Sequence, residues 1–395
     1  MRISTALFHQ LGVNSMLNQQ AELSRTQQQL STGRKILNPA DDPVGSAQIV
    51  GFNQSLASIE QYNKNADQAQ SAVQLEESIY GQVDDLLQNV RERVVQMNNA
   101  SQTNETRGFA ATEVRQQLQQ LLSLANTQDG NGQYLFAGSK SNTQPFNSDF
   151  SYNGDQSTRR MQVSNSRQID VAAPGDRIFS LVRDGNGTFA TAPSAANTGT
   201  GIIDQGSVVD PAQWVAGDYT LSFTGPDTYD ITDGSGPVAS NVSYTSGETI
   251  IDIPGIQFSI SGAPSPGDSF TIKASSSQSM FETLDKIASA LDKNVNTPAE
   301  QAALNNTLNA SLGNLDQALG QVLTARADAG TRLKELDSVR SANEDQVIYY
   351  KQAISVLQDT DFAEAASRLS QQALALEAAQ KSYVQVRDLS LFNYI

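Results

Sequence analysis

Few side chains in this sequence could carry out catalysis. His9 is the single histidine among 395 residues, and there is no cysteine. Nucleophilic catalysis needs a hydroxyl or thiol beside a base that is itself held by a third group, and His9 lies in an N-terminal stretch without a recognisable set of such partners. The absence of cysteine also excludes disulfides, thiol nucleophiles and thiolate metal sites. We therefore expect neither an enzyme nor a cofactor.

Carboxylates are the remaining candidates for a site. Asp227, Asp230 and Asp233 could ligate Ca²⁺, as could the adjacent pair Asp41 and Asp42. Solvated turns are the simpler interpretation, because the first group lies in sequence rich in Gly, Ser and Thr. No metal is predicted, although the sequence leaves open whether the first three bind one. Clustered glycines also lack the spacing and the following helix of a phosphate loop.

The charge and the hydrophobic content limit the partners. Asp and Glu number 42 against 26 Lys and Arg, so the formal net charge is -16. This charge repels nucleic acid and anionic lipid. No segment approaches the ~20 apolar residues of a membrane span. We expect no nucleic-acid and no membrane partner.

Helical periodicity dominates both ends of the chain. Apolar residues recur every three or four positions from Phe52 to Met97, which predicts one long helix, and a shorter helix is expected at about 106–127. It ends before Asp129-Gly130-Asn131-Gly132, a run typical of turns. The aromatic and apolar segment 133–138, QYLFAG, is expected to be a strand. Helical period returns at Met280, breaks near Pro298 and resumes to the C-terminus.

The middle of the chain has a different composition. Residues 147–279 are rich in Gly, Ser, Thr, Asp and Pro, with short apolar or alternating runs at 219–223, 250–253 and 256–260, which predicts short strands and tight turns. The fold class is therefore α+β, a long helical coiled-coil bundle built from both chain ends with a central β-rich insert. The predicted domains are terminal coiled-coil segments at 1–45 and 358–395, a long-helix bundle with a β-hairpin at 46–146 and 280–357, and a surface-exposed β domain at 147–279.

The two terminal segments have the spacing of coiled coils but too little apolar surface to fold alone. Heptads run through Met16, Leu23 and Leu30 near the start and through Phe362, Leu369, Leu376 and Tyr383 near the end, where Ala366 and Ala373 are interleaved. Such segments can stay disordered in a monomer and order when other subunits cover them, forming a helical tube if the contact does not close. The predicted assembly interface comprises Ile3, Leu7, Leu11, Leu17, Leu23, Leu30, Phe362, Leu369, Leu376, Tyr383 and Leu391.

A short loop precedes the long helix. The segment Asn38-Pro39-Ala40-Asp41-Asp42-Pro43 combines turn residues, an acidic N-cap and a proline at the first helical position. Helix capping is enough to explain both carboxylates.

Several segments together indicate a family. QQQLSTGRKILNPADDPVGSAQI at 27–49 closely resembles the N-terminal motif of flagellin-like proteins, particularly their hook-filament junction branch. NGQYLFAGSKSNTQPF at 131–146 resembles the hairpin motif of that branch, and SPGDSFTI at 265–272 and the ending SLFNYI at 390–395 also fit it. The matches cover the helical parts of the chain and only the C-terminal border of the middle.

The resemblance implies a structural adaptor of the bacterial flagellum, without enzymatic activity. Family members lie outside the cell, between the hook and the filament, after export by the flagellar type III apparatus without a cleaved signal peptide. The implied partners are further copies of the chain, the first hook-associated protein, flagellin and a cytoplasmic export chaperone at the C-terminal helix. The terminal segments would form an inner tube, the long helices the next shell and the β insert the surface.

Three alternatives remain at this stage. The chain could be a flagellin, although the LNPADDP loop and YLFAG argue against it. It could be a type III needle-tip or translocator protein, but that class would lack both motifs. The β insert could instead be a carbohydrate-active domain, which would require two carboxylates about 5–9.5 Å apart in a cleft.

Overall fold

The computed structural model describes residues 5–99 and 101–388 and contains two compact units. One unit holds the described residues up to Lys64 and from Val339, and the other is Asn65–Ser338. Helices α2 (Pro43–Met97) and α5 (Pro298–Gln358) contribute residues to both units.

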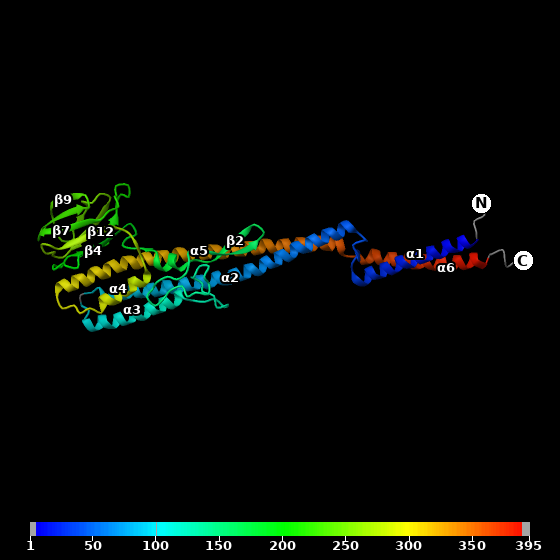
Figure 1. The fold of residues 1–395 in the computed structure, drawn as a ribbon, viewed down its shortest axis with the longest axis horizontal. Coiled ribbons are helices and arrows are strands. Elements are labelled where there is room, and N and C mark those ends of the chain that lie inside the picture. The colour runs from blue at the N-terminus through cyan, green and yellow to red at the C-terminus, as the bar shows by residue number, and fades with distance from the viewer. Residues whose placement is uncertain (1–4, 100, 389–395) are drawn as a thin grey trace. The chain divides into compact units, whose positions relative to one another are not determined.

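The unit made from the chain ends is entirely helical apart from its connections. It contains α1 (Thr5–Thr32), α6 (Phe362–Asp388), the start of α2 and the end of α5. Figure 1 shows α1 in blue and α6 in red side by side, and the two helices are in direct contact. Between α2 and α5, the rings of Phe52 and Tyr350 lie 5.6 Å apart, and the buried Asn343 donates a hydrogen bond to Asn63 (3.0 Å). Far-separated segments therefore fold together here.

The helical part of the second unit contains four helices. They are the later part of α2, α3 (Asn104–Ala125), α4 (Met280–Leu291) and the first part of α5. The apolar stripe expected on the long helix is buried here, from Ala66 through Val73 and Val83 to Met97. α4 begins where Ser279 caps its N-terminus, and α5 begins at Pro298, a residue suited to the first turn. The helical predictions for this part of the chain are confirmed.

A buried charged group joins α2 to α5. The Glu76 side chain is 1% exposed, accepts a hydrogen bond from the Tyr80 hydroxyl (2.6 Å) and pairs with Arg332 (2.9 Å). Arg332 also donates to the carbonyl of Asp170 (2.9 Å). Asp170 belongs to a hairpin of β1 (Arg159–Ser164) and β2 (Arg167–Ala172), and Asn65 holds the other strand at the carbonyl of Gln162. The hairpin is therefore fixed to both long helices.

The rest of the insert is a β domain. Its five-stranded antiparallel sheet has the order β4 (Phe189–Pro193), β12 (Ser269–Ala274), β7 (Tyr219–Gly225), β8 (Thr228–Asp233) and β9 (Gly236–Ser243). A smaller sheet has the order β10 (Thr249–Ile250), β11 (Ile256–Ser261) and β5 (Ile202–Ile203), and β6 (Ser207–Val208) also pairs with β11. After the π-helix η1 (Asp176–Ser180), the short strand β3 (Val182–Arg183) pairs antiparallel with β13 (Ser277–Gln278). Figure 1 shows the main sheet with its strands β4, β7, β9 and β12.

The β domain has its own core and is attached to α5. Alternating side chains of both sheets form one buried cluster, for example Leu221 and Phe270 of the main sheet and Phe258 of the smaller one. The buried Asn306 of α5 donates to the carbonyl of Gly201 and accepts from the N–H of Ile203, both at 2.9 Å. One amide therefore satisfies the backbone beside a strand that has few other partners.

Two strand predictions were wrong. Segment 133–138 forms no strand; it makes a single bridge, between Gln128 and Tyr134. Leu135, Phe136 and Ala137 are all buried, whereas a strand would alternate, and the backbone bonds of this segment go to irregular neighbours such as Thr127. The run 250–253 enters a strand only at Ile250, because the chain then turns toward Gly255, whose φ is +82°.

The fold class is confirmed as α+β, with helices from both chain ends and a central β domain. The predicted domain boundaries remain a prediction. Within residues 5–99 and 101–388, no helix combines the length and apolarity that crossing a membrane requires.

Candidate assembly surface and helix junction

Helices α1 and α6 pack along a regular seam. The seam positions of α1 are His9, Gly12, Met16, Gln19, Leu23, Thr26 and Leu30, and those of α6 are Ala365, Leu369, Gln372, Leu376, Ala379 and Tyr383. Arg25 and Gln29 of α1 are also shielded, next to the loop that follows the helix. The steps alternate between three and four residues, the spacing of a two-helix coiled coil. The helices run antiparallel, since Tyr383 reaches His9 near the start of α1 while Phe362 reaches Gly33 just after its end.

Predicted interface residues fall into two groups. Leu23, Leu30, Leu369, Leu376 and Tyr383 are half-buried at seam positions within the chain itself. The other predicted interface residues that the structure describes are exposed to solvent, with exposed fractions between 52% and 58%: Leu7, Leu11, Leu17 and Phe362. Ile3 and Leu391 lie outside the described residues. The half-buried residues already pack between α1 and α6 of the same chain. The exposed residues are therefore the ones that another subunit could cover.

Further exposed apolar side chains were missed by sequence reasoning. Val13, Leu374 and Val384 extend the exposed surface of α1 and α6, and α2 and α5 add Val44, Val50, Ile348, Tyr349 and Val356 in the same unit. A search for one heptad stripe passes over apolar residues at other offsets. The sequence did contain a signal for this surface, because these helices carry apolar residues outside the single stripe that faces the partner helix.

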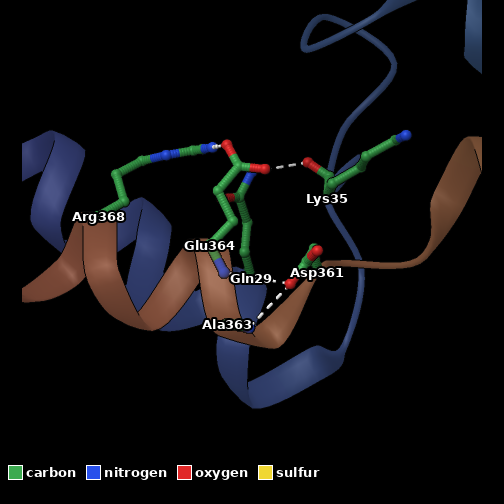
Figure 2. Close-up of polar contacts among 6 residues, drawn as sticks. All are labelled: Gln29, Lys35, Asp361, Ala363, Glu364 and Arg368. Carbon is green, nitrogen blue, oxygen red and sulfur yellow. Dashed lines mark hydrogen bonds and ion pairs between the residues drawn. The ribbon is translucent and has the colours of Figure 1, made fainter.

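The end of α1 and the start of α6 are joined by backbone hydrogen bonds. Lys35 N donates to the carbonyl of Gln358 (2.7 Å), and Thr360 N donates to the carbonyl of Gly33 (2.9 Å). Figure 2 shows Gln29 donating to the carbonyl of Lys35, at 2.7 Å. Gly33 has a φ of +71°, which glycine adopts readily after a helix. The connection that follows α1 is therefore bonded to the connection between α5 and α6.

The start of α6 is capped at this junction. Asp361 accepts hydrogen bonds from Ala363 N (2.9 Å) and Glu364 N (3.1 Å), and Figure 2 shows Glu364 paired in turn with Arg368. A carboxylate at a helix N-terminus satisfies free N–H groups and complements the helix dipole. The helix therefore begins at a defined residue.

The loop 38–43 begins α2. Asp42 accepts a hydrogen bond from Gly45 N (2.9 Å), and Pro43 is the first residue of the helix. A Cβ on Gly45 would lie 2.4 Å from the Asp42 carboxylate, so a larger residue there would displace that carboxylate from its capping position. Asp42 therefore acts as the cap of α2.

Asp41 holds the loop itself. Its carboxylate accepts from Leu37 N and Asn38 N, both at 3.0 Å, and lies 2.8 Å from Arg25 of α1. The bonds from Asn38 and Leu37, with a smaller contribution from Arg25, lower the pKa of Asp41 below its ordinary value. The side chains of Asn38 and Pro39 are exposed, and Asn38 contributes through its backbone, whose carbonyl also accepts from Asp41 N (2.9 Å). The loop thus links the end of α1 to the start of α2.

The other candidate residues have structural partners. His9 lies against the Tyr383 ring, with centroids 5.7 Å apart. Asp230 accepts from Asn241 N (2.6 Å), and Asp233 accepts from Ser235 N and Gly236 N in the turn after β8. Asp227 lies in the turn before β8. In the part of the chain that the structure describes, no three His, Cys, Asp or Glu side chains are grouped so that they could hold a metal.

Comparison with known proteins places this geometry among flagellin-like proteins. The model of the bacterial flagellin N-terminal helical region matches residues 3–141, and that of the flagellar hook-associated protein 1 D2-like domain matches residues 193–274. Flagellin B of Helicobacter pylori is 29% identical over only 140 residues, 35% of this chain and 26% of that protein. Flagellin itself is thus a partial match.

Relatives that match along their whole length define the family. Flagellar hook-associated protein 3 of Escherichia coli K12 is 29% identical over 395 residues, covering 100% of this chain and 99% of that protein. The crystal structure of Xanthomonas campestris FlgL is 35% identical with a TM-score of 0.73, covering 77% of this chain and 99% of its own. Hook-associated protein 3 of Legionella pneumophila is 33% identical with a TM-score of 0.75, covering 78% and 98% respectively. The chain belongs to the hook-associated protein 3 (FlgL) family, structural proteins of the flagellar hook-filament junction.

Proposed function

We propose that copies of this chain assemble through the exposed apolar side chains of α1 and α6 into the junction that connects the flagellar hook to the filament. The observation that carries the proposal is where exposed apolar residues gather. Of nineteen large apolar side chains exposed among the described residues, twelve belong to the unit formed by the chain ends, under a third of the chain. Such a concentration marks a surface that another protein covers.

The role is mechanical, and the chain is not an enzyme. One axial neighbour would be the first hook-associated protein and the other flagellin, so the two faces of the assembled ring must fit different partners. The β domain, with its own core, would remain on the outside. The choice between the two axial partners then depends on how well each partner's surface complements the face that it contacts.

Export belongs to the same proposal. The chain would reach the outside through the flagellar type III apparatus with its N-terminus uncut, and a cytoplasmic chaperone would cover the C-terminal helix until then. Leu374 and Val384 support this, because an exposed apolar helix face invites premature association in the cytoplasm.

Deletion of the gene tests the proposal. Electron microscopy of the cells should show hooks without filaments, and an immunoblot should find flagellin in the medium. The wild-type gene should restore filaments, whereas a gene encoding residues 1–360 should not. Normal filaments on the deletion strain would overturn the proposed junction role.

A matched experiment on the purified truncated chain separates folding from assembly. Residues 65–338 form a compact unit of their own, so removal of residues 361–395, or Leu369→Asp, should leave the β domain folded. Circular dichroism and proton NMR would follow the β signals. Loss of these β signals in the truncated chain would show that the β domain needs the C-terminal helix in order to fold.

A further inference from the structure

Strand β9 is the open edge of the main β sheet, at the end opposite β4 (Figure 1). It contains eight residues and is the longest strand in the part of the chain that the structure describes. It pairs with β8 on one side, and no described strand pairs with its other side. At the opposite edge, β4 contacts β5, and the Thr191 hydroxyl donates to the carbonyl of Asp204 (2.7 Å). The free N–H and C=O groups of an edge strand can pair with a strand of another molecule.

The composition of β9 does not protect this edge. Residues 236–243, GPVASNVS, contain no charged side chain, although charges, above all lysine, commonly keep sheet edges apart. Val238 and Val242 pack against the core of the β domain, which fixes one face of the strand. An uncharged strand that contains β-branched residues is of the type that associates edge to edge. A regular strand of this composition would therefore be open to association.

The backbone of β9 is irregular. Only residues 236–237 and 242–243 pair with β8 in step. Between them Ala239 lies alone opposite Ile231, with a register shift on each side. Each shift is a bulge, at which β9 carries one residue more than β8. The outward N–H and C=O groups of β9 consequently do not form one continuous row.

Two residues of β9 reinforce this irregularity. Pro237 has no N–H to offer another strand. Asn241 has a φ of +54°, a left-handed conformation that asparagine tolerates better than most other side chains. The N–H of Asn241 donates to the Asp230 carboxylate (2.6 Å) and not to a backbone carbonyl. Asp230 thus holds the bulge in place.

We propose that the bulges and Pro237 keep the β9 edge from pairing with β9 of a second copy, so that the β domains stay separate where several copies of the chain lie close together. The excluded partner is a second copy because an uncharged edge strand can pair antiparallel with itself about a two-fold axis. The inference concerns the β domain and does not depend on the proposed junction role.

Straightening the edge tests this inference in the full chain. Deletion of Asn241 removes the extra residue of one bulge and leaves Ala239 and Val242 opposite their present partners, and Pro237→Thr restores an N–H to the strand. Asn241→Gly is the matched control, because glycine adopts the positive φ and keeps the bulge. Sedimentation velocity measures self-association, with the wild type as the baseline for association through the helices. Hydrogen exchange locates the contact.

The straightened variant should self-associate at concentrations at least about tenfold below those that the wild type needs, with concentration-dependent protection at 236–243. The control should match the wild type. Trp214, the single tryptophan, packs against Phe189 and Tyr219 of the β domain, so its fluorescence reports whether the domain remains folded. If the deletion unfolds the domain, Pro237→Thr with Asn241→Thr keeps the chain length and carries the same test, because a β-branched residue disfavours the positive φ.

A folded straightened variant that associates no more than the wild type would overturn the inference. Association without protection at 236–243, or equal association in the Asn241→Gly control, would do the same. Concentration-dependent protection of β9 in the wild type would show that the edge already pairs, which also contradicts the inference.

Discussion

The carboxylate of Glu76 on α2 lies 2.9 Å from the guanidinium of Arg332 on α5, and the Glu76 side chain is only 1% exposed. Tyr80 donates to the second oxygen of Glu76, and burial, reinforced by that carboxylate, raises the pKa of the Tyr80 hydroxyl well above its ordinary value. The pair joins helices from opposite ends of the sequence.

Glu76→Ala should lower the free energy of unfolding by about 3 kcal/mol. The buried Tyr80 hydroxyl would lose its acceptor, and Arg332, whose side chain is only 18% exposed, would lose its carboxylate partner. Glu77→Ala is the matched control. Glu77 pairs with Arg326 at the surface, where an ion pair contributes about 0–1 kcal/mol. Chemical denaturation followed by circular dichroism measures both. Equal losses in the two variants would show that burial of Glu76 does not matter.

Asn306→Ala should weaken the attachment of the β domain to α5. The substitution leaves the N–H of Ile203 and the carbonyl of Gly201 without their partner, at about 1–3 kcal/mol. Hydrogen exchange at Ile203 should accelerate in parallel. Asn305→Ala, a neighbour outside this contact, should cost about 0.5 kcal/mol or less. Unchanged exchange at Ile203 in the Asn306 variant would refute the attachment.

Asp155 should make stability depend on pH below about 4. The hydroxyl and backbone N–H of Ser139, together with Ser157, lower the pKa of Asp155 to about 2 from an ordinary value of 3.8. Because the folded-state pKa lies below the unfolded one, the unfolded chain binds the proton first as pH falls. The contribution is complete above the ordinary pKa and is lost as pH falls toward 2.

Asp155→Asn isolates that contribution. The difference in unfolding temperature between wild type and variant should be largest at pH 6 and should shrink between pH 4 and pH 2. Asp149→Asn provides a comparison at a nearby carboxylate, bonded to Ser151, whose pKa is also lowered. A difference for Asp155→Asn that is constant over this range would contradict the assignment.

Leu11→Asp with Leu17→Asp should abolish assembly while leaving the unfolding of the free chain nearly unchanged, because both side chains are more than half exposed. Asn14→Asp with Asn18→Asp adds the same charges at exposed polar positions of α1 and should be tolerated. Complementation of the deletion strain, scored by motility and by electron microscopy, compares the two. Filaments on cells that carry the leucine variant would exclude this face from the interface.

Local pattern determined much of this protein. Helical period from Phe52 to Met97, the proline and acid before α2 and the change of composition at 147 and 280 are short-range signals, and they gave the order of helix, β domain and helix. Flagellin-like motifs, also local, indicated the family. The strand expected at 133–138 was wrong, because a short aromatic and apolar run in a sequence does not distinguish a strand from an irregular buried segment.

Only the tertiary structure decided which stripe of each terminal helix faces its partner. Ala366 and Ala373 fit a heptad with Leu369 as well as Ala365 and Gln372 do, and the sequence favoured the more apolar choice. The structure instead places Ala365 and Gln372 in the seam and leaves Ala366 and Ala373 exposed. A heptad permits steps of three or four in either order, so the helix across the seam selects between them. The same long-range packing joins Glu76 to Arg332 and Asn306 to β5, contacts between segments that no local pattern relates.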